Sequence, residues 1–341
     1  MAVIFVDGFD AYNGITSAGG ISSVYSYFLT VNNFALTTGR FGGQGVIFYD
    51  GGISYALSNT YNEGTVGFAL RVDAYPPSSY TSVFSVSPGQ FINAPRTYGQ
   101  FTIQMDAAGT LSAYRSNTLL GTTSASLALN VWNYVEIEFN INDTTGFIKI
   151  YFNGNQVLNL TGIDSKNLTA AGFNQFMFGT NTIIYGDFTI DDLYLTDTPT
   201  RLGEQRVETL RPSTDTAQKQ WTPSTGSDNY ATIDETLMSN TDFVSASSAG
   251  VYDLYDFSNL SSVANSITAV TVSALSQKTD AAARAIAFPV KSGSVTSDGA
   301  NNYLSLGYTL NTRLLETDPN TSSAWTSSAV NSIQAGIKVT I

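Results

Sequence analysis

Glu136 and Glu138 are the residues whose type and spacing come nearest to a catalytic pair in this sequence. Residues i and i+2 of a β-strand lie on the same side of the strand, about 7 Å apart. Two carboxyl groups at roughly this separation can hydrolyse a glycosidic bond, because one protonates the leaving group while the other activates water. The pair therefore defines one enzymatic hypothesis, which is glycoside hydrolysis.

The surrounding strand favours a structural interpretation of the same two glutamates. Val135, Ile137 and Phe139 alternate with them, which is typical of a strand with one buried and one wet face. Glucanases built on a jelly roll carry a third acid further along this strand, and residues 139–142, which follow here, include none. We therefore predict that Glu136 and Glu138 keep the outer face wet, that the chain has no catalytic residue, and that it is not an enzyme.

A second acidic group could offer ligands to a metal. Asp187, Asp191 and Asp192 lie within one predicted strand, and calcium prefers several oxygen ligands that converge. Alternation along a strand sends Asp191 and Asp192 to opposite faces. We therefore predict a solvated strand here and no metal site.

Tyrosines are dense in the first hundred residues. Apolar faces of sugars stack on aromatic rings, while ring edges and hydroxyl groups offer hydrogen bonds. Tyrosine is also common in strands and at protein interfaces, so core and partner contacts are the competing interpretation. We predict contacts to a glycan or a partner at four of them, Tyr49, Tyr55, Tyr75 and Tyr80.

The composition excludes several kinds of site. The 341 residues include no cysteine and no histidine, so disulfides, thiolate or imidazole zinc sites and His-dependent triads are impossible. The net charge of −12 argues against nucleic acid and against binding to anionic membranes by charge. The N-terminal residues predict a strand rather than a signal peptide, and no window has the length of a membrane span. We expect no cofactor.

The elements that position these residues are short β-strands. Within Val131–Leu160, apolar residues recur with a period of two, and Asn153-Gly154 is typical of a two-residue hairpin because both residues tolerate positive φ. The segment predicts three antiparallel strands opened by Trp132. Such an arrangement resembles the second half of a laminin G or concanavalin A-like jelly roll.

Residues 1–200 predict one domain. They contain about ten candidate strands joined by Gly, Asn, Ser and Pro, with no convincing helix, which is the pattern of a jelly roll. In such a fold the first and last strands, around Phe5 and Leu193, would pair side by side.

Residues 201–211 predict a connector, and residues 212–341 a smaller β-sandwich domain. A short helix is expected within Thr326–Gly336, with Ser327 or Ser328 as its cap and Gly336 as its end. A final strand, Ile337–Ile341, would close the chain.

Three further stretches carry a resemblance to a known family. The opening Asp7–Tyr12, the block Leu202–Glu235, and the ending formed by Asp318–Thr326 and Gln334–Lys338 resemble virion proteins of tailed bacteriophages with a laminin G-like first domain. Together they span the chain. The resemblance implies an all-β structural component of a phage particle, and it carries no catalytic residue to transfer.

The expected role that follows is an accessory tail or baseplate protein of the virion, assembled in the host cytoplasm, with an outward lectin-like domain that could contact a host-surface glycan. A capsid decoration protein is the alternative, and a glycan-binding module or a glucanase-like enzyme that uses Glu136 and Glu138 is a second one. Expected partners are other virion proteins and further copies of the chain, without nucleic acid or membrane. Residues predicted to dock the second domain on the particle are Arg206, Glu208, Arg211, Trp221 and Trp325.

Overall fold

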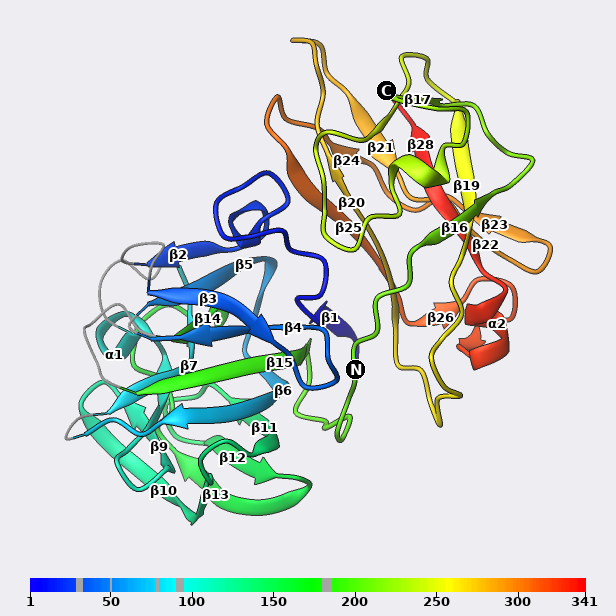
Figure 1. Cartoon of the computed structure of the whole chain (residues 1–341). Coiled ribbons are helices and arrows are strands. Elements are labelled where there is room, and N and C mark those ends of the chain that lie inside the picture. Colours follow the sequence, from blue (N-terminus) through cyan, green and yellow to red (C-terminus); the bar gives the residue numbers. More distant parts are fainter. Residues whose placement is uncertain (29–32, 50, 78–79, 90–94, 180–185) are drawn as a thin grey trace. The chain divides into compact units, whose positions relative to one another are not determined.

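The computed structural model describes residues 1–28, 33–49, 51–77, 80–89, 95–179 and 186–341 (Figure 1). They form two compact units. Unit 1 consists of Met1–Phe9 and Tyr25–Val207, and unit 2 consists of Asp10–Val24 and Glu208–Ile341. The chain therefore passes from one unit to the other more than once, and not only at the predicted connector.

The segment Asp10–Val24 belongs to unit 2, whereas the sequence pattern places it in the domain formed by residues 1–200. The backbone N–H of Met238 donates to the carbonyl of Ala11 (2.8 Å), and the side-chain amide of Asn13 donates to the carbonyl of Met238. A Cβ on Gly19 would lie 2.7 Å from that of Met238. The partner of Asn13 is 225 residues further along the chain, so no local pattern could indicate it.

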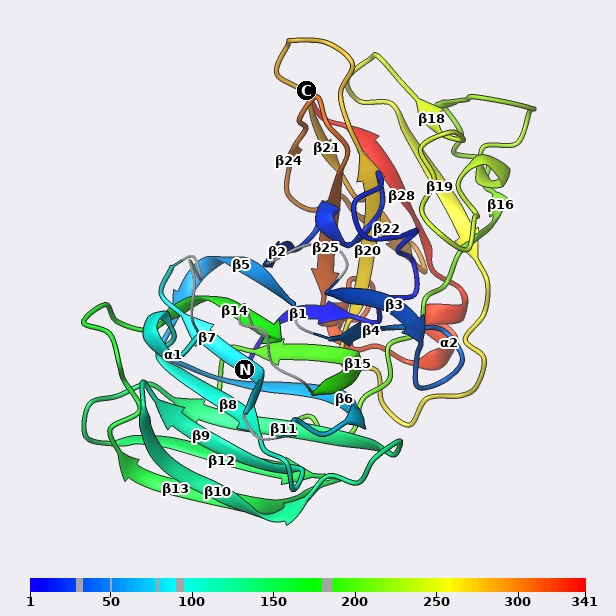
Figure 2. The same ribbon diagram turned by 60° about the vertical axis from the view of Figure 1, so that its left-hand side comes forward.

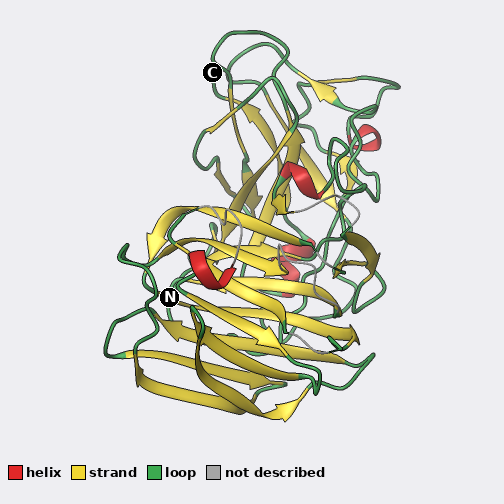
Figure 3. Cartoon of the chain, turned by 90° about the vertical axis from the view of Figure 1, so that its left-hand side faces the viewer, coloured by secondary structure: helices red, strands yellow, loops and turns green. Residues whose placement is uncertain are grey.

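Unit 1 is a sandwich of two antiparallel sheets, whose strands Figures 2 and 3 show from two further sides. In sheet A the strand order is β13-β12-β11-β6-β15-β4-β3, and β1 pairs with β15. In sheet B the order is β10-β9-β8-β7-β14-β5-β2. The strands of sheet A are β1 (Val3–Asp7), β3 (Phe34–Thr38), β4 (Gln44–Phe48), β6 (Glu63–Ala74), β11 (Trp132–Asn140), β12 (Gly146–Phe152), β13 (Asn155–Ile163) and β15 (Asp187–Thr196). Sheet B contains β2 (Ser26–Phe28), β5 (Gly52–Tyr61), β7 (Thr81–Ser87), β8 (Phe101–Met105), β9 (Thr110–Arg115), β10 (Thr118–Ser126) and β14 (Phe173–Gly179), and the short helix α1 (Pro95–Tyr98) precedes β8.

The core of unit 1 lies between the two sheets and is rich in phenylalanine. The ring centroid of Phe139 in sheet A lies 5.1 Å from that of Phe101 in sheet B, and the centroids of Phe68 and Phe178 lie 4.9 Å apart. All four side chains are fully buried. Burial of each such ring stabilises the fold by roughly 1.5–3 kcal/mol, so this aromatic layer holds the two sheets together.

The three strands predicted within Val131–Leu160 are present as β11, β12 and β13. Val135 pairs with Phe152, which places the apolar residues of β11 and β12 on the core face. Asn153 and Gly154 have φ angles of 49° and 82°. These positive values are the ones that a two-residue hairpin turn requires, so the hairpin prediction is confirmed.

The predicted pairing of the first and last strands of unit 1 is also confirmed. In the ladder between β1 and β15, Phe5 pairs with Leu195 and Asp7 pairs with Leu193. Beyond β15, residues 198–207 return across the outer face of sheet A, where their backbone N–H groups donate to side chains of β11 and β15.

Unit 2 is built around sheet C, in which the strand order is β16-β19-β28-β21-β24 and β22 pairs with both β23 and β28. The ribbons β17-β18, β20-β25 and β26-β27 form further small sheets. Trp325, Leu315, Val330 and Ile333 belong to its core. The strands are β16 (Pro212–Asp215), β17 (Thr222–Pro223), β18 (Val244–Ser245), β19 (Tyr252–Phe257), β20 (Val270–Ser276), β21 (Ala285–Ala287), β22 (Val290–Ser292), β23 (Val295–Ser297), β24 (Asn302–Tyr303), β25 (Thr309–Leu315), β26 (Thr317–Asp318), β27 (Ser323–Ala324) and β28 (Gln334–Val339).

The predicted C-terminal helix is present as α2 (Ser327–Asn331), but its ends differ from the prediction. Thr326, not a serine, is the N-cap, because its hydroxyl accepts a hydrogen bond from the N–H of Ala329 (3.1 Å). Gly336 does not end the helix, since it lies within β28. A Cβ there would come within 2.0 Å of the carbonyl oxygen of Asp253 in β19, so the glycine allows two strands to approach.

The regular secondary structure of both units is mainly β-strand, which confirms the predicted all-β class. Two short α-helices, α1 and α2, are found among the described residues. Neither has the length and apolar composition that a membrane-spanning helix requires.

Candidate functional site

β11 places Glu136 and Glu138 on the face of sheet A that points away from the core. Their side chains are nearly excluded from solvent, with exposed fractions of 1% and 8% for the two residues. The prediction that they keep an outer face wet is therefore wrong. The cause is Thr198–Val207, here called the strap, which lies against this face and hydrogen-bonds to it.

The strap is fastened to the sheet through the two glutamates. The backbone N–H of Gly203 donates to Oε1 of Glu136 (2.9 Å), and Nη1 of Arg201 donates to Oε2 of the same residue (3.1 Å). Nε of Arg201 lies 3.9 Å from Oε1 of Glu138. The guanidinium also lies 3.8 Å from the ring centroid of Tyr151, where charge and ring quadrupole attract each other.

Further partners complete this cluster. Nζ of Lys149 lies 3.4 Å from Oε2 of Glu138, which also accepts a hydrogen bond from the hydroxyl of Tyr151 (3.2 Å). The hydroxyl of Tyr194 donates to Oε1 of Glu136 (2.7 Å). Burial and the adjacent carboxylate raise the pKa of Tyr194 far above its usual value, so this phenol stays protonated. The two glutamates thus form a closed ionic cluster, and neither presents an open carboxyl group to a sugar in this conformation.

Alternation predicts that Asp191 and Asp192 point to opposite faces, but both carboxylates approach Arg40. Both residues are also buried, so the prediction of a solvated strand is wrong. A bulge in β15 and a φ of 50° at Asp192 break the alternation. Oδ2 of Asp191 accepts from the backbone N–H of Arg40 (2.7 Å), and Oδ2 of Asp192 lies 3.6 Å from Nη1 of Arg40. In the described part of the chain, no group of three or more acidic residues is arranged to hold a metal ion.

The four predicted tyrosine contacts separate into different environments. Tyr55 is half-buried, and its ring centroid lies 4.3 Å from that of Phe5, so its contact with a glycan or a partner stays a prediction. The hydroxyl of Tyr75 donates to the carbonyl of Leu127 (2.6 Å). Tyr49 and Tyr80 are exposed, with fractions of 40% and 41%. Only these two present a large ring surface to solvent.

Beside Tyr80, sheet B carries polar side chains on its outer face. Ser82 of β7, Gln104 of β8, Ser112 of β9 and Thr122 of β10 are direct cross-strand partners, so they form one line across four strands. We call these four residues the polar row. Their neighbours along each strand face the core, so the row itself faces away from it.

The polar row has aromatic and hydroxyl groups suited to a neutral ligand. The ring centroid of Tyr80 lies 5.8 Å from that of Tyr114, which stands two residues after Ser112 on the same face of β9. The hydroxyls of Ser112 and Thr122 bond to each other (2.8 Å). Thr122 and Tyr80 are exposed, whereas the other members of the row lie deeper.

Ser82 has an unused hydroxyl group. The residue is 1% exposed, and its Oγ has no hydrogen-bond partner among the residues that the structure describes. A buried hydroxyl without a partner is unfavourable by about 1–3 kcal/mol. Such groups mark places where a ligand or a water molecule completes the hydrogen bonding.

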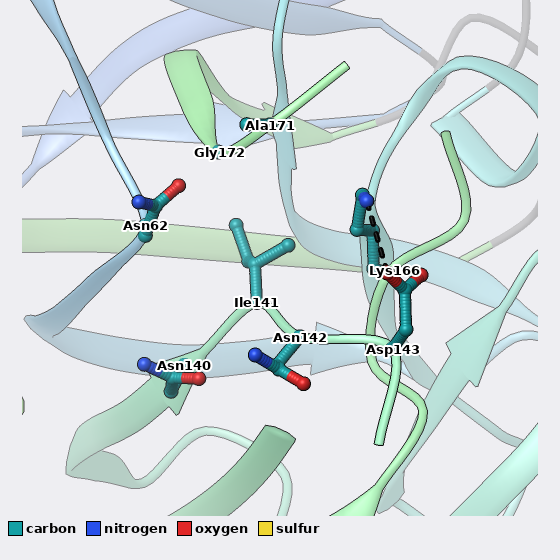
Figure 4. Close-up of a pocket in the computed structure, with 8 residues that line it drawn as sticks. All are labelled: Asn62, Asn140, Ile141, Asn142, Asp143, Lys166, Ala171 and Gly172. Carbon is teal, nitrogen blue, oxygen red and sulfur yellow. Dashed lines mark hydrogen bonds and ion pairs between the residues drawn. The ribbon is translucent and has the colours of Figure 1, made fainter. Parts of the chain in front are cut away.

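A pocket of about 310 Å³ opens elsewhere on unit 1 (Figure 4). It is lined by Asn62, Asn140–Asp143, Lys166 and Ala171–Gly172. In Figure 4, Ile141 lies between Asn62 on one side and the ion pair of Lys166 with Asp143 on the other. The pocket thus combines amides, one ion pair and an apolar side chain.

The two tryptophans predicted to dock unit 2 on a particle are engaged within unit 2. Trp325 is 3% exposed, and its indole N–H donates to the carbonyl of Leu315 (3.1 Å). It is a core residue, so its prediction as a docking residue is wrong. The backbone N–H of Trp221 donates to Oδ1 of the buried Asp253 (2.8 Å), which fixes the loop that carries it.

The three charged residues predicted for docking have partners inside their own unit. The guanidinium of Arg206 lies 4.8 Å from the ring centroid of Phe41, and Oε1 of Glu208 accepts from the backbone N–H of Ser261 (2.6 Å). Arg211 donates to a backbone carbonyl, and burial lowers its pKa. Docking through these residues stays a prediction.

Sequence reasoning missed Ser82, Gln104, Ser112 and Tyr114. Each stands in a strand where polar and apolar residues alternate, as in Phe101–Met105, and that alternation was the available signal. It does not say which polar residues of different strands become neighbours. That depends on the register between strands, which only the folded sheet fixes.

Comparison with known proteins identifies similar folds only. No family model and no curated protein matches the sequence. The solved structure of cellulose induced protein Cip1 is 12% identical, with a TM-score of 0.42 over 59% of this chain and 99% of Cip1. Alginate lyase Aly36B is 16% identical, with a TM-score of 0.40 over 58% of this chain and 98% of the lyase. Trypanosoma rangeli sialidase is 13% identical, with a TM-score of 0.37 over 54% of this chain, which spans only 30% of the sialidase.

Two of these similar structures are enzymes, a lyase and a sialidase. This finding contradicts the prediction that the chain is not an enzyme, and that prediction is withdrawn. The likeness is one of fold alone, so it assigns neither an activity nor a substrate to this chain.

Proposed function

We propose that this chain is a component of a tailed-phage particle whose unit 1 binds a glycan on the outer face of sheet B. The observation that carries the binding proposal is the polar row beside the exposed ring of Tyr80. The resemblance of three sequence stretches to phage virion proteins supports the particle. Both parts can be tested separately.

The chemistry of the row favours a neutral oligosaccharide. The ring of Tyr80 offers an apolar surface to one face of a sugar. Thr122 offers an exposed hydroxyl group, and the row itself contains no charged side chain.

The glucanase-like alternative is less well supported by the geometry of its two glutamates. Hydrolysis needs a carboxyl group on each side of the scissile bond, with access for the sugar. Glu136 and Glu138 instead contact Arg201 under the strap, and both are buried. A reaction at this pair would require the strap to leave.

Within the particle, the proposed role is an accessory tail or baseplate protein, present in several copies and in contact with other virion proteins. Residues after Arg201 would make most contacts with the particle, and unit 1 would remain outward. A capsid decoration protein is the alternative. A cryo-EM map of the particle separates them, because the two locations differ in symmetry and copy number. A particle that lacks the chain would contradict both.

Glycan binding is tested with the purified full chain and a panel of neutral oligosaccharides on an array, followed by calorimetry for those that bind. We expect Tyr80→Ala to weaken binding at least about tenfold, as the loss of one stacked ring implies. Tyr49→Ala is the matched control, since Tyr49 has almost the same exposure. Equal losses in both variants, or no binding by the wild type, would contradict the proposed site. Mass spectrometry of the same mixtures shows whether any oligosaccharide is also cleaved.

A further inference from the structure

Three segments of unit 1 meet around the pocket of about 310 Å³ that Figure 4 shows. Asn62 joins β5 to β6, Ile141–Asp143 follows β11, and Lys166–Gly172 precedes β14. The volume is at the small end of ligand pockets in proteins. The polar row contributes none of the residues that line the pocket.

Two amides of the pocket have their orientation fixed by the fold. Oδ1 of Asn142 accepts from the backbone N–H groups of Thr144 (2.9 Å) and Thr145 (3.0 Å), which leaves its Nδ2 as a donor. Nδ2 of Asn140 donates to Oε2 of Glu63 (2.9 Å), which leaves its Oδ1 as an acceptor. One donor and one acceptor are therefore preset.

Asn62 adds an amide that the fold does not use. Its side chain has no hydrogen-bond partner within the described part of the chain, and it is exposed. Gly172 makes room beside it, because a Cβ there would lie 2.7 Å from Oδ1 of Asn62 and 2.3 Å from the carbonyl oxygen of Tyr61. The wall of the pocket at this point requires glycine.

The backbone around the pocket is held by a buried serine. Oγ of Ser165, which is fully buried, donates to the carbonyl of Asn140 (2.7 Å) and accepts from the N–H of Asn142 (3.1 Å). The N–H of Ser165 donates to the carbonyl of Asn142 (3.0 Å). These bonds fix the segment that carries both asparagines.

Gln100 holds the opposite wall. Its Oε1 accepts from the N–H groups of Asn167 (3.1 Å) and Leu168 (3.0 Å), and its Nε2 donates to the carbonyls of Ala170 (2.8 Å) and Gly172 (2.9 Å). Gln100 itself is fully buried. Both walls are therefore preformed, which lowers the entropic cost of binding a ligand.

The charges of the pocket select a neutral ligand. Nζ of Lys166 lies 3.1 Å from Oδ2 of Asp143, so each charge already has a partner. An anion would approach the carboxylate of Asp143, and a cation would approach the ammonium group of Lys166. Donors and acceptors around the apolar side chain of Ile141 match the alternation of hydroxyl groups and C–H surface on a sugar ring.

We propose that this pocket is a second binding site of unit 1, which takes a neutral, hydroxyl-rich ligand of about one sugar ring. The site is separate from the polar row, and it does not depend on the function proposed above.

The test uses the full chain and saturation-transfer NMR with glucose, galactose and N-acetylglucosamine, followed by a titration for each sugar that gives a signal. Asn62→Ala removes an amide on which the fold does not depend. We expect affinity to fall about fivefold, as for one lost hydrogen bond. Asn159→Ala is the matched control and should bind like the wild type, because Asn159 is also exposed and its side chain makes no hydrogen bond within the described residues. Ala171→Tyr should abolish the signal by filling the pocket.

Several results would overturn this second site. They are the absence of any sugar signal, unchanged binding by both Asn62→Ala and Ala171→Tyr, or equal weakening by Asn159→Ala. Binding that is lost in Tyr80→Ala and kept in Asn62→Ala would place the sugar on the polar row. That outcome would remove the second site and leave the proposed function standing. Binding that is lost in Asn62→Ala and kept in Tyr80→Ala would support the second site and remove the site on the polar row.

Discussion

The two outer faces of the sandwich in unit 1 use polar residues in opposite ways. On sheet A, Glu136 and Glu138 carry charge, and the strap buries them against Arg201. On sheet B, the polar row is neutral and includes the unpartnered hydroxyl of Ser82. Buried charges must be paired within the fold, so they serve the fold, whereas neutral groups can keep hydrogen-bonding capacity for a ligand.

The largest expected effect comes from a change on the outer face of sheet A, which the strap covers. Arg201→Ala leaves Glu136 buried without its cation, so the free energy of unfolding of unit 1 should fall by about 3 kcal/mol. Urea unfolding followed by hydrogen exchange in peptides from β11 measures this. Arg115→Ala is the control, because Arg115 is equally exposed but its partner Asp164 is not buried, and its loss should be below about 1 kcal/mol. Equal losses would show that the strap is not fastened by this ion pair.

The second largest effect is the pH dependence of stability that the buried tyrosines on the outer face of sheet A produce. Burial raises the pKa of Tyr194 and of Tyr134, so both keep their protons in the folded state above pH 10, where the unfolded chain loses them. Below pH 10 the two tyrosines do not change the free energy of unfolding with pH. Above pH 10 this free energy should fall by about 1.4 kcal/mol per pH unit for each tyrosine. Tyrosinate absorbance from these residues should appear only with unfolding. Ionisation of both in the folded protein would contradict the burial argument.

Two serines on the outer face of sheet B differ in whether their hydroxyl group has a hydrogen-bond partner. Oγ of Ser85 bonds to Oγ1 of Thr102 (3.1 Å), so Ser85→Ala should destabilise unit 1 by about 1 kcal/mol. Ser82→Ala removes a hydroxyl without a partner and should change stability by less than about 0.5 kcal/mol, or increase it. Urea unfolding of both variants checks this. A large loss with Ser82→Ala would mean that its hydroxyl already serves the fold.

The smallest of these predicted effects is that of salt on the affinity of the polar row for a neutral oligosaccharide. Between about 0.1 M and 1 M salt the Debye length falls from about 10 Å to about 3 Å, which screens charged contacts but not neutral ones. The affinity of unit 1 for a neutral oligosaccharide should therefore change less than about twofold, as measured by calorimetry. A steep decrease would point to a charged ligand and to residues outside the polar row.

The strand pattern could be predicted from the sequence, since alternation in β11 and β12 and the turn at Asn153-Gly154 are local signals. The burial of Glu136 under the strap could not be predicted in this way. Alternation says which side of a strand a residue occupies, but not what covers that side. The cover here is Arg201, 65 residues later, in a segment without regular structure. Trp325 fails for the same reason, because its burial depends on β25 and other distant segments.

The polar row shows a second limit of sequence reasoning. Ser82, Gln104 and Ser112 each look like ordinary polar positions in a strand, and they become one surface only through the pairing of β7, β8 and β9. Tyr80 could be predicted because it belongs to the dense tyrosines of the first hundred residues. Its neighbour Tyr114 could not, since it lies in a later strand.

The most direct test of glycan binding on sheet B is a crystal structure of the full chain with a neutral oligosaccharide selected from the panel. We expect one sugar ring stacked on Tyr80, with a sugar hydroxyl within hydrogen-bonding distance of Oγ1 of Thr122. An oligosaccharide bound on sheet A after displacement of the strap, or bound only in the asparagine-lined pocket, would contradict the proposal.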